Sequence, residues 1–159
     1  MSRTFAEDLA RGIQRQNEIA PKLIRLMNRE MVPTSVSTHE MDWVSPEDER
    51  VFAEFKGRED YTAEYIDKYC GGTVWIGKNK IDYLKKVGGV CDFFWGFKDS
   101  LWRMRYDETT ANAIHRCKSR LHARNRADKA NDKSVVMDIP FTMLTLVEKY
   151  QPQPMFVED

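Results

Sequence analysis

The feature that most constrains the fold is an alternating stretch at residues 51–56, Val-Phe-Ala-Glu-Phe-Lys. In a β-strand successive side chains point to opposite faces, so Glu54 and Lys56 leave the strand on the same face. Apolar residues occupy both faces, which indicates a strand that is at least partly buried. A carboxylate and an ammonium group on such a strand need partners or a role.

The residues before this strand predict a β-hairpin. A short strand ends near Asp42, and residues 45–48, Ser-Pro-Glu-Asp, have the composition of a turn. The hairpin would bring Asp42 close to Glu54 from the partner strand. Two other acids, Glu40 and Asp48, lie near enough in the sequence to take the place of Asp42.

The rest of the chain alternates between helical and strand patterns. Apolar residues recur at intervals of three, four or seven over residues 2–32, which predicts a long helix with Ser2 as N-cap and Pro33 beyond its end. The other predicted helices cover residues 62–69, 78–86, 109–126 and 140–150, and the other predicted strands cover residues 73–76, 90–95, 100–106 and 135–139. This order predicts an α/β fold with a mixed central sheet flanked by helices.

Length and charge narrow the functional classes. The chain has 159 residues, which is the length of one domain, and it has no apolar run long enough for a transmembrane helix. Its 25 basic and 25 acidic residues cancel, so the whole molecule does not attract nucleic acid. Basic residues are concentrated in residues 116–133, however, and this predicts a local basic surface.

With these elements in order, the chain resembles the PD-(D/E)xK nuclease superfamily, which has the restriction-endonuclease-like fold. In that family a helix packs on the sheet, one strand carries an Asp, and the next carries Glu-x-Lys or Asp-x-Lys before a further helix and strand. Asp42 matches the Asp, and Glu54 and Lys56 match a triplet that occurs once in this chain. Met41 stands where the family has its Pro.

The resemblance covers residues 5–106 and looks most like the small phage-type members. It implies one nuclease-like domain over residues 1–159, whose core is followed by a basic helical C-terminal part over residues 107–150. A phage protein of this kind would act in the host cytoplasm. The absence of a signal-peptide pattern and the wide spacing of the cysteines also favour the cytoplasm.

The resemblance also implies a reaction and the residues that carry it. Asp42 and Glu54 would bind Mg²⁺ or Mn²⁺, and Lys56 would assist the water that attacks a phosphodiester bond in DNA. Glu18 on the first helix is a further candidate metal ligand, because some relatives place a Glu there. The expected nucleic-acid-binding residues are Arg58, Lys78, Lys80, Arg116, Lys118, Arg120 and Arg124.

Other interpretations of the same residues remain open. The chain could be a non-catalytic factor that binds nucleic acid or protein and keeps the nuclease-like fold. It could also be an interaction protein whose first and last helices form a dimer interface. Glu54 and Lys56 would then be an ordinary solvated pair on an edge strand. Many relatives cut both DNA strands as dimers, so a homodimer is a further expectation.

Overall fold

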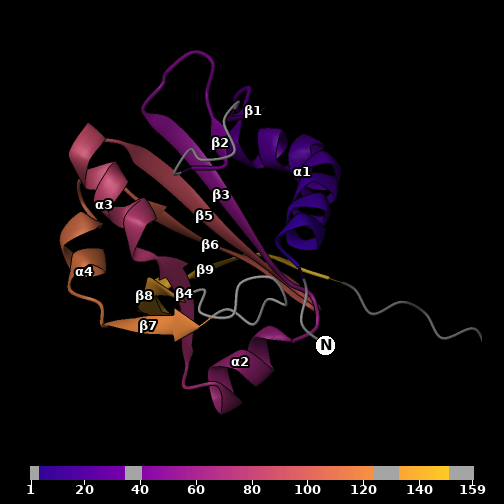
Figure 1. Ribbon diagram of the computed structural model, residues 1–159, viewed down its shortest axis with the longest axis vertical. Helices are drawn as coiled ribbons and strands as arrows, with labels where there is room; N and C mark the ends of the chain where they lie inside the picture. Colours follow the sequence, from indigo (N-terminus) through magenta and orange to yellow (C-terminus); the bar gives the residue numbers. More distant parts are fainter. Residues whose placement is uncertain (1–3, 35–40, 124–132, 151–159) are drawn as a thin grey trace, which may run out of the picture.

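The computed structural model describes residues 4–34, 41–123 and 133–150. Within these residues the strands form a six-stranded and a three-stranded sheet, and helices lie on both faces of the larger sheet (Figure 1). The predicted α/β class, a mixed central sheet flanked by helices, is therefore confirmed. Among the paired strands described, β3 and β5 run parallel and the other neighbours run antiparallel.

The elements have the following bounds. The helices are α1 (Phe5–Met27), α2 (Ala63–Tyr69), α3 (Lys78–Val87), α4 (Ala111–His115) and the 3₁₀ turn η1 (Phe141–Met143). The larger sheet has, in spatial order, β1 (Val32–Pro33), β2 (Trp43–Val44), β3 (Val51–Arg58), β5 (Val90–Phe97), β6 (Ser100–Tyr106) and β9 (Thr145–Lys149). The smaller sheet has β4 (Thr73–Gly77), β8 (Lys133–Pro140) and β7 (Ser119–Ala123).

The first helix is shorter than predicted. It begins after the N-cap Thr4, whose hydroxyl accepts the backbone N–H of Glu7 at 3.1 Å while the Glu7 carboxylate accepts the N–H of Thr4. It ends before Asn28, which adopts the left-handed conformation with φ 51°. The predicted end at residue 32 is wrong because the chain there enters β1. The predicted N-cap Ser2 lies outside the described residues.

The apolar stripe of α1 is buried only in part. Leu23 is buried against Ala53 and Phe94 of the larger sheet, and its apolar neighbours from Ile19 onward pack beside it. Leu9, in the first half of the helix, is exposed. The helix therefore contacts the sheet through its C-terminal half.

The opposite face of the larger sheet carries the main apolar core. Phe93 and Trp95 of β5 point to this side, where Ile81 and Leu84 of α3 and Ile76 of β4 cover them. Figure 1 shows α1 on one side of the sheet, and α3, α4 and the smaller sheet on the other. The two faces of β3 therefore meet different partners.

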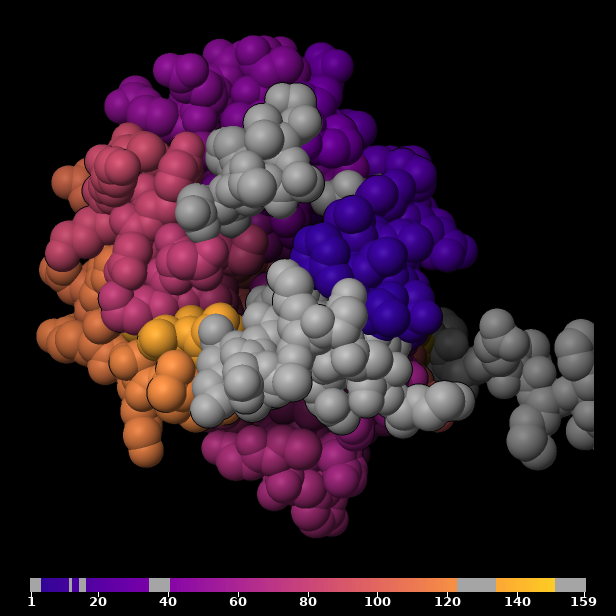
Figure 2. Space-filling view, viewed as in Figure 1, coloured from indigo at the N-terminus to yellow at the C-terminus, as the bar shows by residue number. Residues whose placement is uncertain are grey.

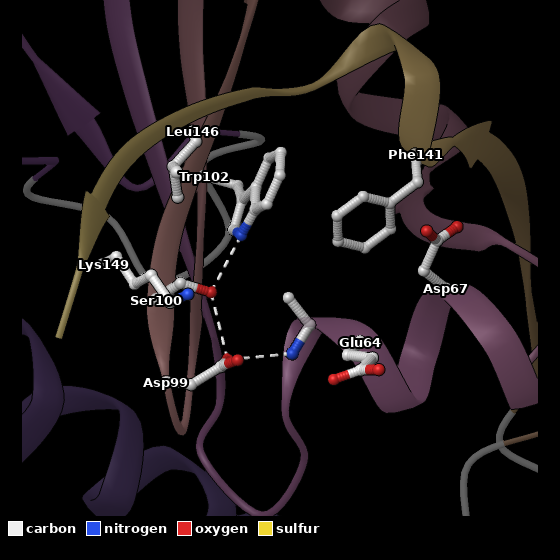
Figure 3. A pocket seen from close by; sticks show the side chains of 9 residues that line it. Glu64, Asp67, Asp99, Ser100, Trp102, Phe141, Leu146 and Lys149 are labelled. Carbon is white, nitrogen blue, oxygen red and sulfur yellow. Dashed lines mark hydrogen bonds between the residues drawn. The ribbon is translucent and has the colours of Figure 1, made fainter. Parts of the chain in front are cut away.

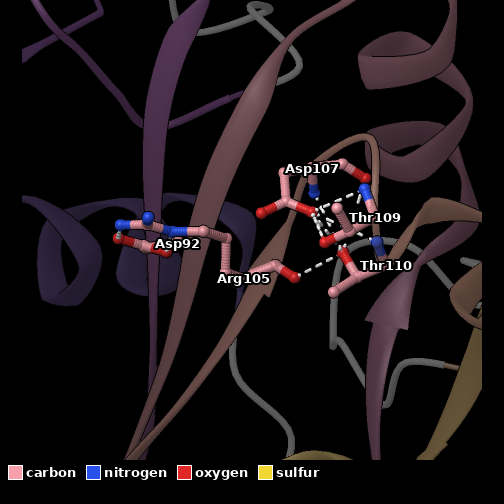
Figure 4. Close-up of polar contacts among 5 residues, drawn as sticks. All are labelled: Asp92, Arg105, Asp107, Thr109 and Thr110. Atoms are coloured by element: carbon pink, nitrogen blue, oxygen red, sulfur yellow. Dashed lines mark hydrogen bonds and ion pairs between the residues drawn. The ribbon is translucent and has the colours of Figure 1, made fainter.

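The predicted helical C-terminal part is wrong. Among the described residues of the span predicted over residues 109–126, only Ala111–His115 is helical, and Ser119–Ala123 forms β7 instead. The turn before α4 is closed by Asp107, whose Oδ1 accepts the N–H groups of Thr109 and Thr110 at 2.9 and 3.1 Å (Figure 4). The helix predicted over residues 140–150 is η1 followed by β9, because this segment pairs with the edge of β6.

Candidate active site

β3 presents Glu54 and Lys56 to the face of the larger sheet that α3 and the smaller sheet cover. The alternation predicted for this strand is confirmed, since Ala53 lies in the cluster beneath α1 and Phe52 lies in the cluster on the other side. The Phe52 ring packs edge-on against Tyr83 of α3, with 5.8 Å between the ring centroids. β3 lies between β2 and β5, so Glu54 is on a central strand. An ordinary solvated pair on an edge strand is excluded.

The Glu54 side chain is fully buried. Its Oε1 accepts the backbone N–H of Asp42 at 2.6 Å and the ammonium group of Lys80 at 3.1 Å. Its Oε2 has no hydrogen-bond partner in the part of the chain that the structure describes. The indole N–H of Trp95 also has none among these residues, and Trp95 is the residue of β5 that lies beside Lys56 in the sheet register. Buried polar atoms are normally bonded to protein or water, so these two atoms mark a place for a ligand or water.

Asp92 on β5 is a second buried carboxylate, and its hydrogen bonding differs from that of Glu54. Both of its oxygens accept from the Arg105 guanidinium of β6, with Nε to Oδ1 at 2.8 Å and Nη2 to Oδ2 at 3.0 Å (Figure 4). Asp92 pairs with Ala53 across the sheet and therefore belongs to the α1 side. A bidentate pair of this kind satisfies the carboxylate, whereas Glu54 keeps one oxygen unbonded.

Asp42 is the acid that the fold brings to Glu54. Trp43 pairs with Ala53 in the antiparallel register of β2 and β3, which places Asp42 opposite Glu54. Asp42 immediately precedes β2, so the strand predicted to end near it begins after it instead. Asp48 lies in the turn, where its carboxylate accepts the N–H of Arg50 at 3.0 Å. Glu40 lies outside the described residues.

Burial and neighbouring charges shift the pKa values of the site. Burial raises the pKa of Glu54 from 4.5 to about 7, and Asp42 adds to this effect although Lys80 and Lys56 oppose it. Burial lowers the pKa of Lys56 from 10.5 to about 8 against the attraction of Glu54. For Lys80, burial favours the neutral amine, but the attraction of Glu54 and Asp42 outweighs it and raises the pKa. Such opposed shifts in one buried cluster are typical of functional sites.

At the end of β3, cationic side chains lie against aromatic rings of the smaller sheet. The Trp75 ring of β4 lies 4.7 Å from Cζ of Arg58 and 5.6 Å from Nζ of Lys56. The His122 ring of β7 lies 4.6 Å from the Trp75 ring. Neither Trp75 nor His122 is among the site residues predicted from the sequence. The sequence did indicate that Trp75 lies on the face of β4 opposite the buried Val74 and Ile76, because side chains alternate along a strand.

Neither Glu18 nor Lys78 is brought to Glu54. Glu18 is exposed on α1, where Oε1 accepts from Gln14 at 3.2 Å, and α1 packs on the opposite face of the sheet from Glu54. Lys78 is paired with Asp82 one turn along α3, at 2.7 Å, on the exposed side of that helix. Of the two lysines at the start of α3, only Lys80 faces the carboxylate.

The predicted basic segment is not one helical surface. Arg116 is the C-cap of α4, Lys118 precedes β7, and Arg120 on β7 forms an ion pair with Asp138 at 2.7 Å. This pairing reduces the charge that Arg120 offers to a phosphate. Arg124 lies outside the described residues. The cations that lie beside Glu54 are therefore Lys56 and Lys80, and Arg58 lies near Lys56.

A pocket of about 280 Å³ lies between α2 and the strands β6 and β9 (Figure 3). Trp102 and Phe141 form its apolar wall, with their rings edge-to-face and the centroids 4.9 Å apart. Carboxylates outnumber ammonium groups in its lining, so the pocket does not suit a phosphate. The charged residues that line it are Glu64, Asp67, Asp99 and Lys149.

Comparisons with protein-family models, with curated proteins and with solved structures found no match to this chain. The site must therefore be interpreted from its own residues and geometry. Among the residues described, no group of three or more His, Cys, Asp and Glu side chains is placed to hold a metal ion. Across the same residues, no helix has both the length and the apolar character needed to cross a membrane.

Proposed function

We propose that the chain is a Mg²⁺- or Mn²⁺-dependent endonuclease that hydrolyses phosphodiester bonds in DNA. The observation that carries the proposal is the Glu54 carboxylate, which is fully buried beside Asp42, Lys56 and Lys80 and has one oxygen without a hydrogen-bond partner among the described residues. Burying an ionisable group without full pairing costs free energy, and an apolar residue at this position would avoid that cost. The chain has 25 acidic residues, but this one stands where an apolar residue would be expected. A catalytic role gives this costly arrangement a reason.

The two acids fit a hard divalent cation. Mg²⁺ prefers oxygen ligands, keeps several waters and is commonly held by one or two carboxylates together with substrate phosphate. Asp42 and Glu54 would supply those carboxylates, and the unbonded Oε2 of Glu54 is available as a ligand. A bound ion of this type lowers the pKa of a coordinated water and neutralises charge on the phosphate. A dedicated cage of many protein ligands is not required.

The cations of the site have separate tasks in this proposal. Lys80 holds Oε1 of Glu54 and fixes the orientation of the carboxylate. Lys56 has a pKa lowered to about 8, so near neutral pH it is charged and can still exchange a proton with the attacking water. Arg58 at the end of β3 would contact a phosphate next to the one that is cleaved.

The order of elements around Glu54 also supports the proposal. β1, β2 and β3 are antiparallel neighbours, and β3 then pairs in parallel with β5 through a crossover that contains α2, β4 and α3. The PD-(D/E)xK family, which the sequence resembles, has an Asp on one strand, Glu-x-Lys on the next, and a further helix and strand after it. A restriction-endonuclease-like core is thus part of the proposal.

The test is metal-dependent cleavage. Purified protein is incubated with plasmid, branched and single-stranded DNA in Mg²⁺, in Mn²⁺ and in EDTA. We expect cleavage with either metal and none with EDTA, and a loss of about 10²-fold or more in Glu54→Gln, Lys56→Met and Asp42→Asn. Asp48→Asn is the matched control, because Asp48 is a nearby exposed acid in the turn. Equal rates in wild type and Glu54→Gln would end the proposal.

Metal binding is measured on the same proteins without DNA. We expect Mg²⁺ at tenfold its dissociation constant to stabilise the wild type by about 1.4 kcal/mol and to leave Glu54→Gln unchanged, since binding to the folded state shifts unfolding by mass action. A protein that binds DNA in a salt-dependent manner but shows neither cleavage nor Mg²⁺ binding would be the non-catalytic factor instead.

A further inference from the structure

Three tyrosines form a column of exposed rings on α2 and the turn before it. The rings of Tyr61 and Tyr65 are stacked, with centroids 5.6 Å apart and 16° between their planes, and the Tyr69 ring follows 5.4 Å beyond Tyr65. These residues are 46%, 45% and 73% exposed. Tyr65 and Tyr69 are four residues apart and therefore lie on one side of α2, and Tyr61 precedes this helix. Grouped large aromatic side chains on a surface mark an interaction site more often than a lone one does.

The tyrosine column begins where β3 ends. The N–H of Tyr61 donates to the carbonyl of Arg58 at 3.1 Å, and the carbonyl of Tyr61 accepts the N–H of Lys98 at 2.8 Å. β3 therefore leads from Glu54 through Lys56 and Arg58 directly to the column. In Figure 2, α2 forms the lower end of the molecule, and Figure 1 shows the strands of the larger sheet above it. The column thus follows directly on the end of β3 in the chain, and its rings are open to solvent.

Charges near the column decide what kind of contact it offers. Glu64 is paired with Lys68 on α2. Asp67 lies on the side of the helix that lines the pocket (Figure 3). Before α2, the basic residue Arg58 is followed in the sequence by the acids Glu59 and Asp60. Four of the six charged residues named here are acidic and two are basic, so the column adds no positive charge of its own and offers a contact through its flat rings.

We propose that Tyr61, Tyr65 and Tyr69 stack the bases of unpaired nucleotides next to the cleaved bond, so that the substrate is DNA with a single-stranded segment. This inference rests on the proposed nuclease function. Aromatic side chains bind single strands in this way because every base has a flat face, and the binding tolerates any sequence. Cations at the end of β3 would hold the phosphates while the rings hold the bases.

The test is the affinity for a fluorescently labelled single-stranded oligonucleotide, measured by anisotropy in EDTA so that no cleavage occurs. We expect Tyr65→Leu to bind about tenfold more weakly and Tyr65→Phe to bind like the wild type, because stacking needs the ring and not the hydroxyl. The salt dependence should be the same in all three proteins, since stacking releases no counterions. Arg58→Ala, by contrast, should reduce the salt slope by about one.

The outcomes separate this inference from the nuclease proposal. Tyr65→Leu should cleave single-stranded or flapped DNA more slowly than the wild type, and Tyr65→Phe should cleave it at the wild-type rate. Equal single-strand affinity in wild type and Tyr65→Leu overturns the inference, even if Glu54 proves to be catalytic. A lower melting temperature in Tyr65→Leu, with wild-type affinity once the protein is folded, also overturns it, because the rings then only stabilise α2. Tyrosine-dependent binding without any cleavage supports the column and rejects the nuclease.

Discussion

The backbone N–H of Asp42 donates a hydrogen bond of 2.6 Å to Oε1 of Glu54, which ties the residue before β2 to the centre of β3. The bond uses the main chain of Asp42, so the substitution Asp42→Asn leaves it in place and removes only the side-chain charge. Since that charge helps to raise the pKa of Glu54, we expect Glu54 to titrate at a lower pH in Asp42→Asn than in wild type. NMR titration of the labelled Glu54 carboxyl carbon measures the shift, and an unchanged titration would mean that the two carboxylates do not interact.

The stability of the protein should depend on the ionisation of Glu54. Its pKa rises from 4.5 to about 7 on folding, so the folded state binds more protons than the unfolded state between these values, and the free energy of unfolding falls as the pH rises through them. The free energy of unfolding of wild type minus that of Glu54→Gln should therefore fall by on the order of 3 kcal/mol from pH 4.5 to pH 7.5. Urea unfolding at several pH values measures it.

Lys56 acts in the opposite direction and in a different range. Its pKa is lowered from 10.5 to about 8, so the free energy of unfolding that its burial costs is recovered as the pH rises from about 8 to 10.5. Measurements below pH 8 therefore report Glu54 without a contribution from Lys56. A difference between wild type and Glu54→Gln that is constant from pH 4.5 to 7.5 would contradict the shifted pKa of Glu54.

The part of the site that lies on one strand could be predicted from the sequence. The alternation of β3 is a local, period-two pattern, and it correctly placed Glu54 and Lys56 on one face. The register of the hairpin was predictable only approximately, so Asp42 could not be separated from Glu40 and Asp48 until β2 was seen to pair with β3.

The apolar pattern of α3 distinguishes Lys80 from Lys78, although the prediction named both lysines. Lys80 lies four residues before the buried Leu84 and next to the buried Ile81, so it shares the inward stripe of α3. Lys78 is about 200° away from Lys80 around the helix, at 100° per residue. The rotation of α3 against the sheet, which these two apolar residues set, decides which lysine reaches Glu54.

The C-terminal part could not be predicted because its strands depend on distant partners. β7 pairs with β8, which itself pairs with β4 from much earlier in the sequence, and β9 adds to the edge of β6. Leu144 and Val147 are three residues apart and gave a helical spacing. Strand formation is decided by such pairing more than by local preference, so the helical interpretation failed.

The division of α1 into a buried and an exposed half predicts unequal effects of two similar substitutions. Leu23→Ala removes a side chain that is buried against Ala53 and Phe94, and we expect it to lower the free energy of unfolding by about 2–5 kcal/mol. Leu9→Ala is the matched control on the exposed half and should cost less than about 0.5 kcal/mol. Urea unfolding compares them. Equal losses would show that the first half of α1 is also packed.

The two lysines at the start of α3 give a similar comparison for charge. Lys80 is mostly buried and pairs with the fully buried Glu54, whereas Lys78 pairs with Asp82 in solvent. Breaking a buried ion pair leaves a costly unpaired charge, so Lys80→Met should lower the free energy of unfolding by about 2–4 kcal/mol at pH 8. Lys78→Met should change it by less than about 0.5 kcal/mol.

The pH dependence of the stability lost in Lys80→Met shows whether this loss comes from the ion pair with Glu54. At pH 5 the Glu54 carboxyl is mainly protonated, because its pKa is about 7, and it no longer leaves a charge unpaired when Lys80 is removed. The cost of Lys80→Met should therefore be smaller at pH 5 than at pH 8, while the effect of Lys78→Met stays small at both. Both lysines lie in the first turn of α3, so the effect of the helix dipole on them is similar and cancels in the comparison. A cost for Lys80→Met that is the same at both pH values would mean that Lys80 stabilises the fold through packing of its aliphatic chain and not through Glu54.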